Sequence, residues 1–131
     1  MRDGFWALES FPIPIADELS RLSEYIATQP EGLRVSVDEP PSDRYVIPQS
    51  LVILVQNAQR NNVCSSEQPL QVNIHFHKHH IEVTNNIQPC QQAEGQMAGL
   101  NELDALYRSH YNLPTVYQTE DSFSVSIPLF I

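Results

Sequence analysis

Hydrophobic residues recur along the chain at two alternating periods, and each period predicts one type of element. In residues 15–26 they lie three or four positions apart, which predicts a helix that ends before Pro30 and Gly32. In residues 33–37 they alternate with polar residues, which predicts a half-buried strand. The chain is therefore expected to begin its fold with a helix followed by a strand.

A broader apolar stripe follows a brief strand expected at residues 45–47. We expect Pro48 to open this second helix, because a proline in the first turn loses no helical hydrogen bond. The Asn61-Asn62 pair is the expected stop. The stripe is wide enough to require a sheet beneath it, and its members are Leu51, Val52, Leu54, Val55 and Ala58.

The second half of the chain predicts two hairpins with a helix between them. Residues 70–76 and 81–83 alternate at period two on either side of a Lys78-His79-His80 turn. Residues 85–98 are polar and without period, which indicates a loop, and residues 99–111 show helical spacing. Strands at 115–118 and 122–129 close the chain. This order predicts an α+β fold with helices packed on one face of a mixed sheet.

Charge limits the partners that this fold would suit. Seven Lys and Arg against sixteen Asp and Glu give a formal net charge of −9. That balance argues against nucleic acid or an anionic membrane surface, because both attract clustered cations. No apolar run approaches the length of a membrane span, and the start lacks the pattern of a signal peptide, so we expect a cytoplasmic location. Cys64 and Cys90 lack metal-ligand spacing and are expected to be unpaired thiols.

Five stretches of the chain resemble a known family when they are taken in order and spacing. They are Ile13-Pro14-Ile15 with Glu18-Leu19, Ile47-Pro48-Gln49-Ser50-Leu51 running on to Gln56-Asn57-Ala58, residues 81–86, Gly99-Leu100 through Tyr107, and Val125-Ser126-Ile127-Pro128. Together they resemble the ATP-binding domain of the GHKL superfamily, and most closely that of LytS/YehU-like sensor histidine kinases. The second stretch, which is similar to the family's N-box, is the strongest signal.

The resemblance implies a two-layer α/β sandwich of the GHKL (Bergerat) type over residues 15–131. Residues 1–14 would then be an extended lead-in, the remnant of an upstream helical segment. ATP and Mg²⁺ would lie between the N-box helix and the lid helix. The chain would be the cytoplasmic part of a sensor, free of direct membrane contact.

Three residues of the implied site lie on the N-box helix and at a strand end. Asn57 matches the asparagine that holds Mg²⁺, a hard cation that prefers oxygen ligands. Gln56 stands where the family has a glutamate base, and an amide cannot take up a proton at neutral pH. Asn85 replaces the aspartate that reads adenine, and its carbonyl can still accept the adenine amino proton.

The remaining implied residues surround the phosphates. Gly99 would present its N–H to phosphate at a helix start, and Arg60 is the one cation that follows the N-box. Glu102 replaces an asparagine with a carboxylate that would repel phosphate oxygens. Met97 and Ile87 replace two family glycines, and Gly95 is close enough in sequence to substitute for the first.

Two hypotheses about function follow from this pattern. In the first, the chain is the ATP-binding domain of a two-component kinase, weakened at its site, with a phosphoacceptor helical hairpin and a response regulator as partners. In the second, it is a pseudo-kinase interaction module that kept the fold and lost nucleotide chemistry. None of the five histidines lies in a phosphoacceptor context, so we expect no autophosphorylation by this chain alone. A monomer or weak dimer is expected, because the family dimerises mainly through that hairpin.

Two groups of polar residues can be interpreted without the family resemblance. His75, His77, His79 and His80 could converge on a transition metal. A solvated strand face ending in a hairpin is the favoured alternative, and no zinc is expected. Asp17, Glu18 and Glu24 are predicted to form the exposed face of the first helix.

Overall fold

The computed structural model describes residues 11–91, 95–97, 99–108, 110 and 112–131. Its main feature is a five-stranded sheet in the order β2-β4-β5-β7-β6. The strands are β2 (Leu33–Val37), β4 (Leu70–Phe76), β5 (His80–Asn86), β6 (Thr115–Gln118) and β7 (Ser122–Pro128). β2 runs parallel to β4, and the other neighbours are antiparallel. The sheet is therefore mixed, as predicted.

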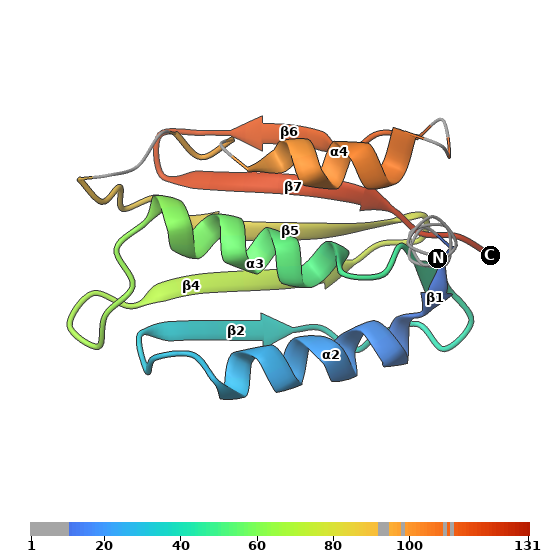
Figure 1. The fold of residues 1–131 in the computed structure, drawn as a ribbon, viewed down its shortest axis with the longest axis horizontal. Coiled ribbons are helices and arrows are strands. Elements are labelled where there is room, and N and C mark those ends of the chain that lie inside the picture. Colours follow the sequence, from blue (N-terminus) through green and yellow to red (C-terminus); the bar gives the residue numbers. More distant parts are fainter. Residues whose placement is uncertain (1–10, 92–94, 98, 109, 111) are drawn as a thin grey trace, which may run out of the picture.

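Three helices form the second layer: α2 (Ile15–Ala27), α3 (Ser50–Asn61) and α4 (Leu100–Arg108). Figure 1 shows all three on the same face of the sheet, with α3 in the middle. Strand residues alternate between this face and the opposite one, which places Val72, Ile74 and Val83 under the helices. The α+β, two-layer architecture is confirmed.

A second, two-stranded sheet closes the end at which the described chain starts. β1 (Ile13–Pro14) pairs antiparallel with β3 (Tyr45–Val46), and Tyr45 also bridges to Phe130. Residues 13 and 14 of the proposed lead-in thus contact the domain. Residues 1–10 of that lead-in lie outside the described residues, and the domain boundary stays a prediction.

Several predicted boundaries differ from the structure. α3 begins at Ser50 and not at Pro48, because Gln49 takes a left-handed conformation with φ of 74°. β5 continues to Asn86, because Asn85 and Asn86 stay paired with β7, so the loop expected from residue 85 begins later. The described part of α4 ends at Arg108, and Tyr111, the predicted end, lies outside the described residues.

The prediction that Glu18 is exposed is wrong. Its side chain is fully buried, and its two carboxylate oxygens accept hydrogen bonds from the backbone N–H groups of Gln49 at 2.8 Å and Leu51 at 3.0 Å. These are N–H groups at the start of α3 that lack partners within the helix. Glu18 therefore joins α2 to the N-terminus of α3, where a negative charge is also favoured by the helix dipole.

α4 is joined to the same helix start by a buried hydroxyl pair. The Tyr107 hydroxyl lies 2.7 Å from Ser50 Oγ, and Ser50 Oγ also donates to the Ile47 carbonyl at 2.7 Å. Burial raises the pKa of the Tyr107 hydroxyl far above its ordinary value, so it remains protonated and able to donate. The start of α3 is thus fixed by side chains from both other helices.

Two further sequence predictions concern cysteines and membrane spans. Cys64 and Cys90 are both free and half-buried, as expected. Within the described residues, none of the helices has the length and apolar character that crossing a bilayer requires.

Candidate functional site

The implied nucleotide cleft lies where the second half of α3 meets the turn that leads into α4. Asn57 is buried at this point, and its side-chain amide donates to the Gln96 carbonyl at 2.7 Å. A Cβ added to Gly99 would lie 3.0 Å from Asn57 Oδ1 and 2.6 Å from an Arg60 guanidinium nitrogen. The fold thus brings Asn57, Arg60 and Gly99 together, although they are up to 42 positions apart in the numbering.

The backbone before α4 depends on glycine at two positions. Gly95 has φ of 114° and Gly99 has φ of 94°, a region that side chains with a Cβ rarely adopt. Met97, which stands at a family glycine, points outward and is 59% exposed. The turn therefore keeps the tight geometry of a glycine-containing segment around Gly99.

Gln96 fills the space between these elements with its side chain. It is buried, and its Oε1 accepts a hydrogen bond from Asn62 Nδ2 at 2.8 Å. Its Nε2 donates to Asn62 Oδ1 at 3.2 Å and to the Asn61 carbonyl at 3.4 Å. The resulting cluster of side-chain amides, which we call the amide cluster, consists of Asn57, Asn61, Asn62, Asn85 and Gln96.

Asn85 joins the amide cluster from the sheet. It is buried near the end of β5, where its Nδ2 donates to the Asn86 carbonyl at 2.9 Å and lies 3.5 Å from Gln96 Oε1. Ile87, which follows at a family glycine position, packs against the hydrophobic core. Gln96 therefore connects the residue implied for adenine with the residue implied for Mg²⁺.

The α3 end of the amide cluster is tied to the loops beside it. Asn61 Nδ2 donates to both the carbonyl and Oδ1 of Asn57, at 2.9 and 3.2 Å. Asn62 Nδ2 also donates to the Ala58 carbonyl at 2.9 Å, and Asn62 Oδ1 accepts from the Gln88 N–H at 2.8 Å. Each asparagine thus has several partners within the protein.

Sequence reasoning missed three members of this cluster. The Asn61-Asn62 pair is predicted to end the helix, with Asn61 at a family histidine position, and Gln96 falls in the predicted aperiodic loop. The Asn-Asn pair carries some signal, since two amides at a helix end favour capping and turns. A single glutamine among polar neighbours carries none, because its role follows from the tertiary position of the turn.

Two of the sequence-predicted site residues lie away from the cluster. Gln56 is exposed on α3, near Tyr25 of α2, whose hydroxyl donates to Gln59 Oε1 at 2.7 Å. Glu102 is exposed in the first turn of α4. The roles assigned to all six site residues, Gln56, Asn57, Arg60, Asn85, Gly99 and Glu102, stay predictions.

The histidines of β4, β5 and the turn between them lie toward the turn end of this hairpin. Two of them form separate contacts with carboxylates. His75 Nδ1 lies 2.8 Å from Asp38 Oδ2, and His77 Nε2 lies 3.4 Å from Glu82 Oε1. The rings of His77 and His80 stack with centroids 4.4 Å apart and 15° between their planes. The nitrogen lone pairs of two stacked imidazole rings lie in nearly parallel planes. They therefore do not converge on a single metal ion.

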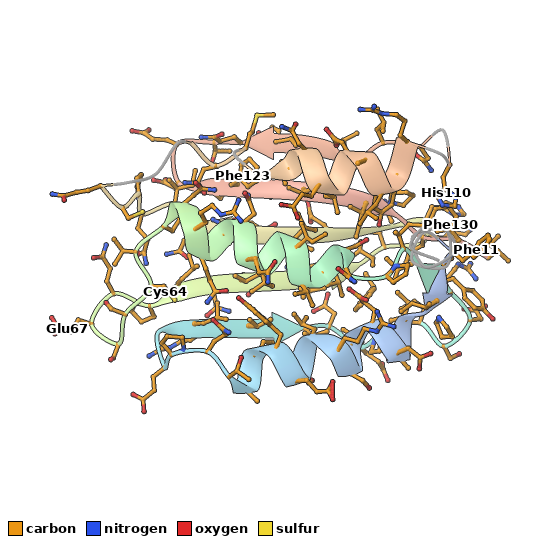
Figure 2. All side chains as sticks on the ribbon, viewed as in Figure 1. Phe11, Cys64, Glu67, His110, Phe123 and Phe130 are labelled. Carbon is orange, nitrogen blue, oxygen red and sulfur yellow. The ribbon has the colours of Figure 1, made fainter. Side chains whose placement is uncertain are left out.

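The fifth histidine, His110, belongs to the same end of the molecule. Its ring centroid lies 5.2 Å from that of Phe130. Figure 2 labels both side chains, which lie close together at this end of the molecule. Across the part of the chain that the structure describes, no group of three or more His, Cys, Asp or Glu residues is arranged to hold a metal. This geometry agrees with a solvated strand face, and the expectation that zinc is absent stays a prediction.

Two surface hollows lie outside the amide cluster. One, of about 250 Å³, lies near the start of β6 and includes His79, His80 and Leu113 in its lining. The other, of about 420 Å³, lies along α2 beside Pro40. Both are open to solvent, and neither is lined by a residue of the amide cluster.

Comparisons with known proteins identify the fold. No family model matches the sequence, and a search of curated proteins finds no match. Among solved structures, the fold is similar to that of the mycobacterial sensor histidine kinase MprB, with a TM-score of 0.56 and 14% identity over 92% of this chain and 97% of that chain. The catalytic domain of histidine kinase ThkA matches with a TM-score of 0.58 and 16% identity over 90% of this chain and 94% of that chain.

A third match is the Acinetobacter baumannii histidine kinase AdeS, with a TM-score of 0.59 and 13% identity. The match covers 90% of this chain and 66% of the AdeS chain, slightly less than two thirds of the latter. At these identities the likeness establishes the fold alone. The chain therefore has the fold of histidine kinase catalytic domains.

Proposed function

We propose that this chain is a histidine kinase-type domain that no longer binds nucleotide and serves as a protein-interaction module in signalling. The observation that carries the proposal is the side chain of Gln96, which occupies the space between α3, β5 and the turn before α4. A nucleotide in that space would have to displace Gln96 and break its hydrogen bonds. Each buried polar group left without a partner would cost about 1–3 kcal/mol.

The residues implied for Mg²⁺ do not fit the ion in this arrangement. Asn57 Oδ1 already accepts from Asn61 Nδ2, and Asn57 Nδ2 points to the Gln96 carbonyl. Mg²⁺ prefers octahedral oxygen ligation with at least one carboxylate. The adjacent Gln56 supplies an amide in place of a carboxylate, and it is exposed on another side of α3. We therefore assign no phosphoryl-transfer step to this site.

The charge around the site supports the same proposal. Arg60, beside Gly99, is the cation that remains available to phosphate. The formal charge of the whole chain is −9, which opposes a polyanionic ligand.

A second candidate function is weak ATP binding, as in the domain of an active sensor kinase. The juxtaposition of Asn57, Arg60 and Gly99 favours it, since these are the positions that the family resemblance implies for Mg²⁺ and phosphate. In that case Asn57 would hold Mg²⁺, Asn85 would contact adenine, and Gly99 would offer its N–H to phosphate. The nucleotide would have to displace Gln96 from its contacts with Asn57 and Asn85.

The finer assignments belong to the same proposal. Within the histidine kinases, we assign the chain to the LytS/YehU-like group on the stretch from Ile47 to Ala58. A cytoplasmic location, a phosphoacceptor helical hairpin on another segment and a response regulator are proposed as its context. For the interaction module, the hairpin and the regulator are binding partners and not substrates.

Thermal unfolding with Mg-ATP tests the proposal. A ligand at 100 times its Kd would raise the free energy of unfolding by about 2.7 kcal/mol, equivalent to a rise of several degrees in Tm. We expect no rise in Tm at millimolar Mg-ATP. The control is Gly99→Ala, which disturbs the turn and should respond to Mg-ATP no differently from the wild type. A saturable rise that Gly99→Ala abolishes would establish the second candidate instead.

A further inference from the structure

A short row of apolar side chains lies on the outer face of the two-stranded sheet and its C-terminal neighbour. Tyr45 pairs with Pro14 on one side and exchanges two backbone hydrogen bonds of 2.8 Å with Phe130 on the other. Residues directly opposite each other share a face, so these three side chains lie side by side. Val46, the next residue of β3, points the other way and is fully buried. The face of Pro14, Tyr45 and Phe130, which we call the terminal row, is therefore the outward one.

The terminal row is bordered by further exposed apolar groups. Tyr45, in its centre, is 40% exposed. Phe11, two positions before β1, is 59% exposed, and Ile131, which follows Phe130, is 91% exposed. Figure 1 shows β1 and the C-terminus at the same end of the molecule, and Figure 2 labels Phe11 and Phe130 there. Single exposed apolar side chains are ordinary on a protein surface, whereas a group of them marks a surface that another segment or molecule covers.

We propose that residues 5–8 of the same chain fold back over the terminal row and place the indole of Trp6 on the ring of Tyr45. Residues 5–8, which lie outside the described residues, contain three large apolar side chains and no charge. They end three positions before Phe11, at the border of the row. An aromatic side chain covers about 150–250 Å² when it is buried, so one indole is large enough to cover the exposed part of Tyr45.

The length of the connecting chain permits this contact. Pro12 and Pro14 fix their own φ angles and disfavour a helical conformation in the residues before them, so the chain entering β1 is a stiff arm. From Phe11 to Pro14, beside Tyr45, this arm spans at most about 10 Å. The five positions from Phe11 back to Trp6 span up to about 17 Å. The chain can therefore turn before the arm and return over it.

A segment of the same chain is favoured over a separate molecule as the occupant. A short tether gives the segment an effective concentration in the millimolar range at the row. A second copy would have to overcome the repulsion between two chains of net charge −9, which does not act on the uncharged residues 5–8. The inference goes beyond the proposed function and does not depend on whether the cleft binds nucleotide.

Tryptophan fluorescence of the intact chain tests the proposal. Trp6 is the only tryptophan, so selective excitation of tryptophan reports its surroundings alone. We expect an emission maximum at shorter wavelength than that of free N-acetyltryptophanamide. We also expect acrylamide to quench Trp6 less than it quenches this reference compound, equally at low and high protein concentration.

Two matched substitutions locate the contact. Tyr45→Ser removes the ring beneath the indole and should raise the acrylamide quenching constant by at least about twofold. Tyr117→Ser is the control, because Tyr117 is a 70% exposed tyrosine on β6, the edge strand of the five-stranded sheet. It should leave the quenching constant unchanged, and circular dichroism should show the same folding in both variants.

A second measurement on the unchanged chain is independent of any disturbance of β3 by Tyr45→Ser. Nuclear Overhauser effects should connect the indole protons of Trp6 with the ring protons of Tyr45. Their absence would overturn the proposal, as would a Trp6 that acrylamide quenches as strongly as the reference compound, or equal quenching in the two variants. Protection that appears only at high protein concentration would also overturn it, because the occupant would then be a second copy. None of these results bears on nucleotide binding, which is measured separately by Mg-ATP-dependent melting.

Discussion

The Gln96 side chain connects a helix and a strand that are far apart in the sequence. It comes from a turn, yet it bonds to Asn62 on the helix side and approaches Asn85 on the sheet side. Its side-chain amide carries an NH2 donor and a carbonyl acceptor, so it can donate to the oxygen of one neighbouring amide and accept from the NH2 group of another. The amide cluster therefore stabilises the closed arrangement of α3, β5 and α4 without a ligand.

Gln96→Ala is predicted to destabilise the protein by about 1–3 kcal/mol, because Asn62 would lose its amide partner in a buried position. Urea denaturation measures this difference. Gln91→Ala, at an exposed position just before the same segment, is the control and should change stability by less than about 0.5 kcal/mol. Equal effects from the two substitutions would mean that the amide cluster contributes nothing to stability.

The buried carboxylate of Glu18 makes a separate prediction about pH. Burial raises the pKa of Glu18 above its ordinary value, against the smaller opposing effect of the Gln49 and Leu51 N–H groups. The folded state then holds the proton more tightly than the unfolded state. The corresponding stability is fully present below the ordinary pKa and is lost as the pH rises through the raised pKa.

Glu18→Gln removes this titration while it keeps an oxygen for the helix start. The stability of the wild type relative to Glu18→Gln should therefore fall as the pH rises through this window, measured by urea denaturation from about pH 4 to pH 8. Glu24→Gln, on the exposed side of the same helix, is the control. A difference that stays constant or grows with pH would contradict the assigned direction.

At the scale of elements, the start of α3 is the point at which the three helices are joined. Glu18 reaches it from α2, and Tyr107 reaches it from α4. Gln49 precedes it in a left-handed conformation, which is costly for a residue with a Cβ. The bond from Gln49 N–H to Glu18 offsets part of this cost.

Tyr107→Phe tests the α4 connection. The substitution keeps the buried ring and removes the hydroxyl that contacts Ser50 Oγ, so we expect a loss of about 1 kcal/mol. Thermal or urea denaturation measures it. Tyr117→Phe, with its hydroxyl on an exposed side chain, should leave the stability unchanged. A loss of similar size in both variants would exclude the buried hydroxyl pair as the cause.

The elements themselves could be predicted from the sequence, because periodic burial determines them. The alternation of Val72 and Ile74 with polar neighbours required a strand, and the stripe from Leu51 to Ala58 required a helix on a sheet. Glu18 could not be predicted in this way. Its position in the helix suited an exposed face, and only the approach of Gln49 and Leu51 makes a buried carboxylate tolerable.

The candidate site could be predicted only in part, because it too depends on contacts between residues far apart in the sequence. The family resemblance pointed to Asn57 and Gly99, and the fold brings them together. It did not indicate that Gln56 would face Tyr25. A cluster of amides depends on distances between segments far apart in sequence, which no local period encodes.

At the scale of the whole molecule, the chain has the fold of histidine kinase catalytic domains. Likeness to MprB and ThkA extends over most of the chain, and identity is below 20%. The net charge of −9 disfavours a polyanionic ligand, and the Gln96 side chain lies between Asn62 and Asn85.

The central claim is that Gln96 and its partners occupy the place of a nucleotide. Two-dimensional ¹H–¹⁵N NMR observes the side-chain amides of Asn57, Asn62 and Gln96 directly during a titration with Mg-ATP. The account predicts that these resonances, and the backbone resonance of Gly99, stay unshifted at millimolar Mg-ATP. Saturable shifts of the three amides together with Gly99 would contradict it, because they would mean that nucleotide enters the cleft and displaces Gln96.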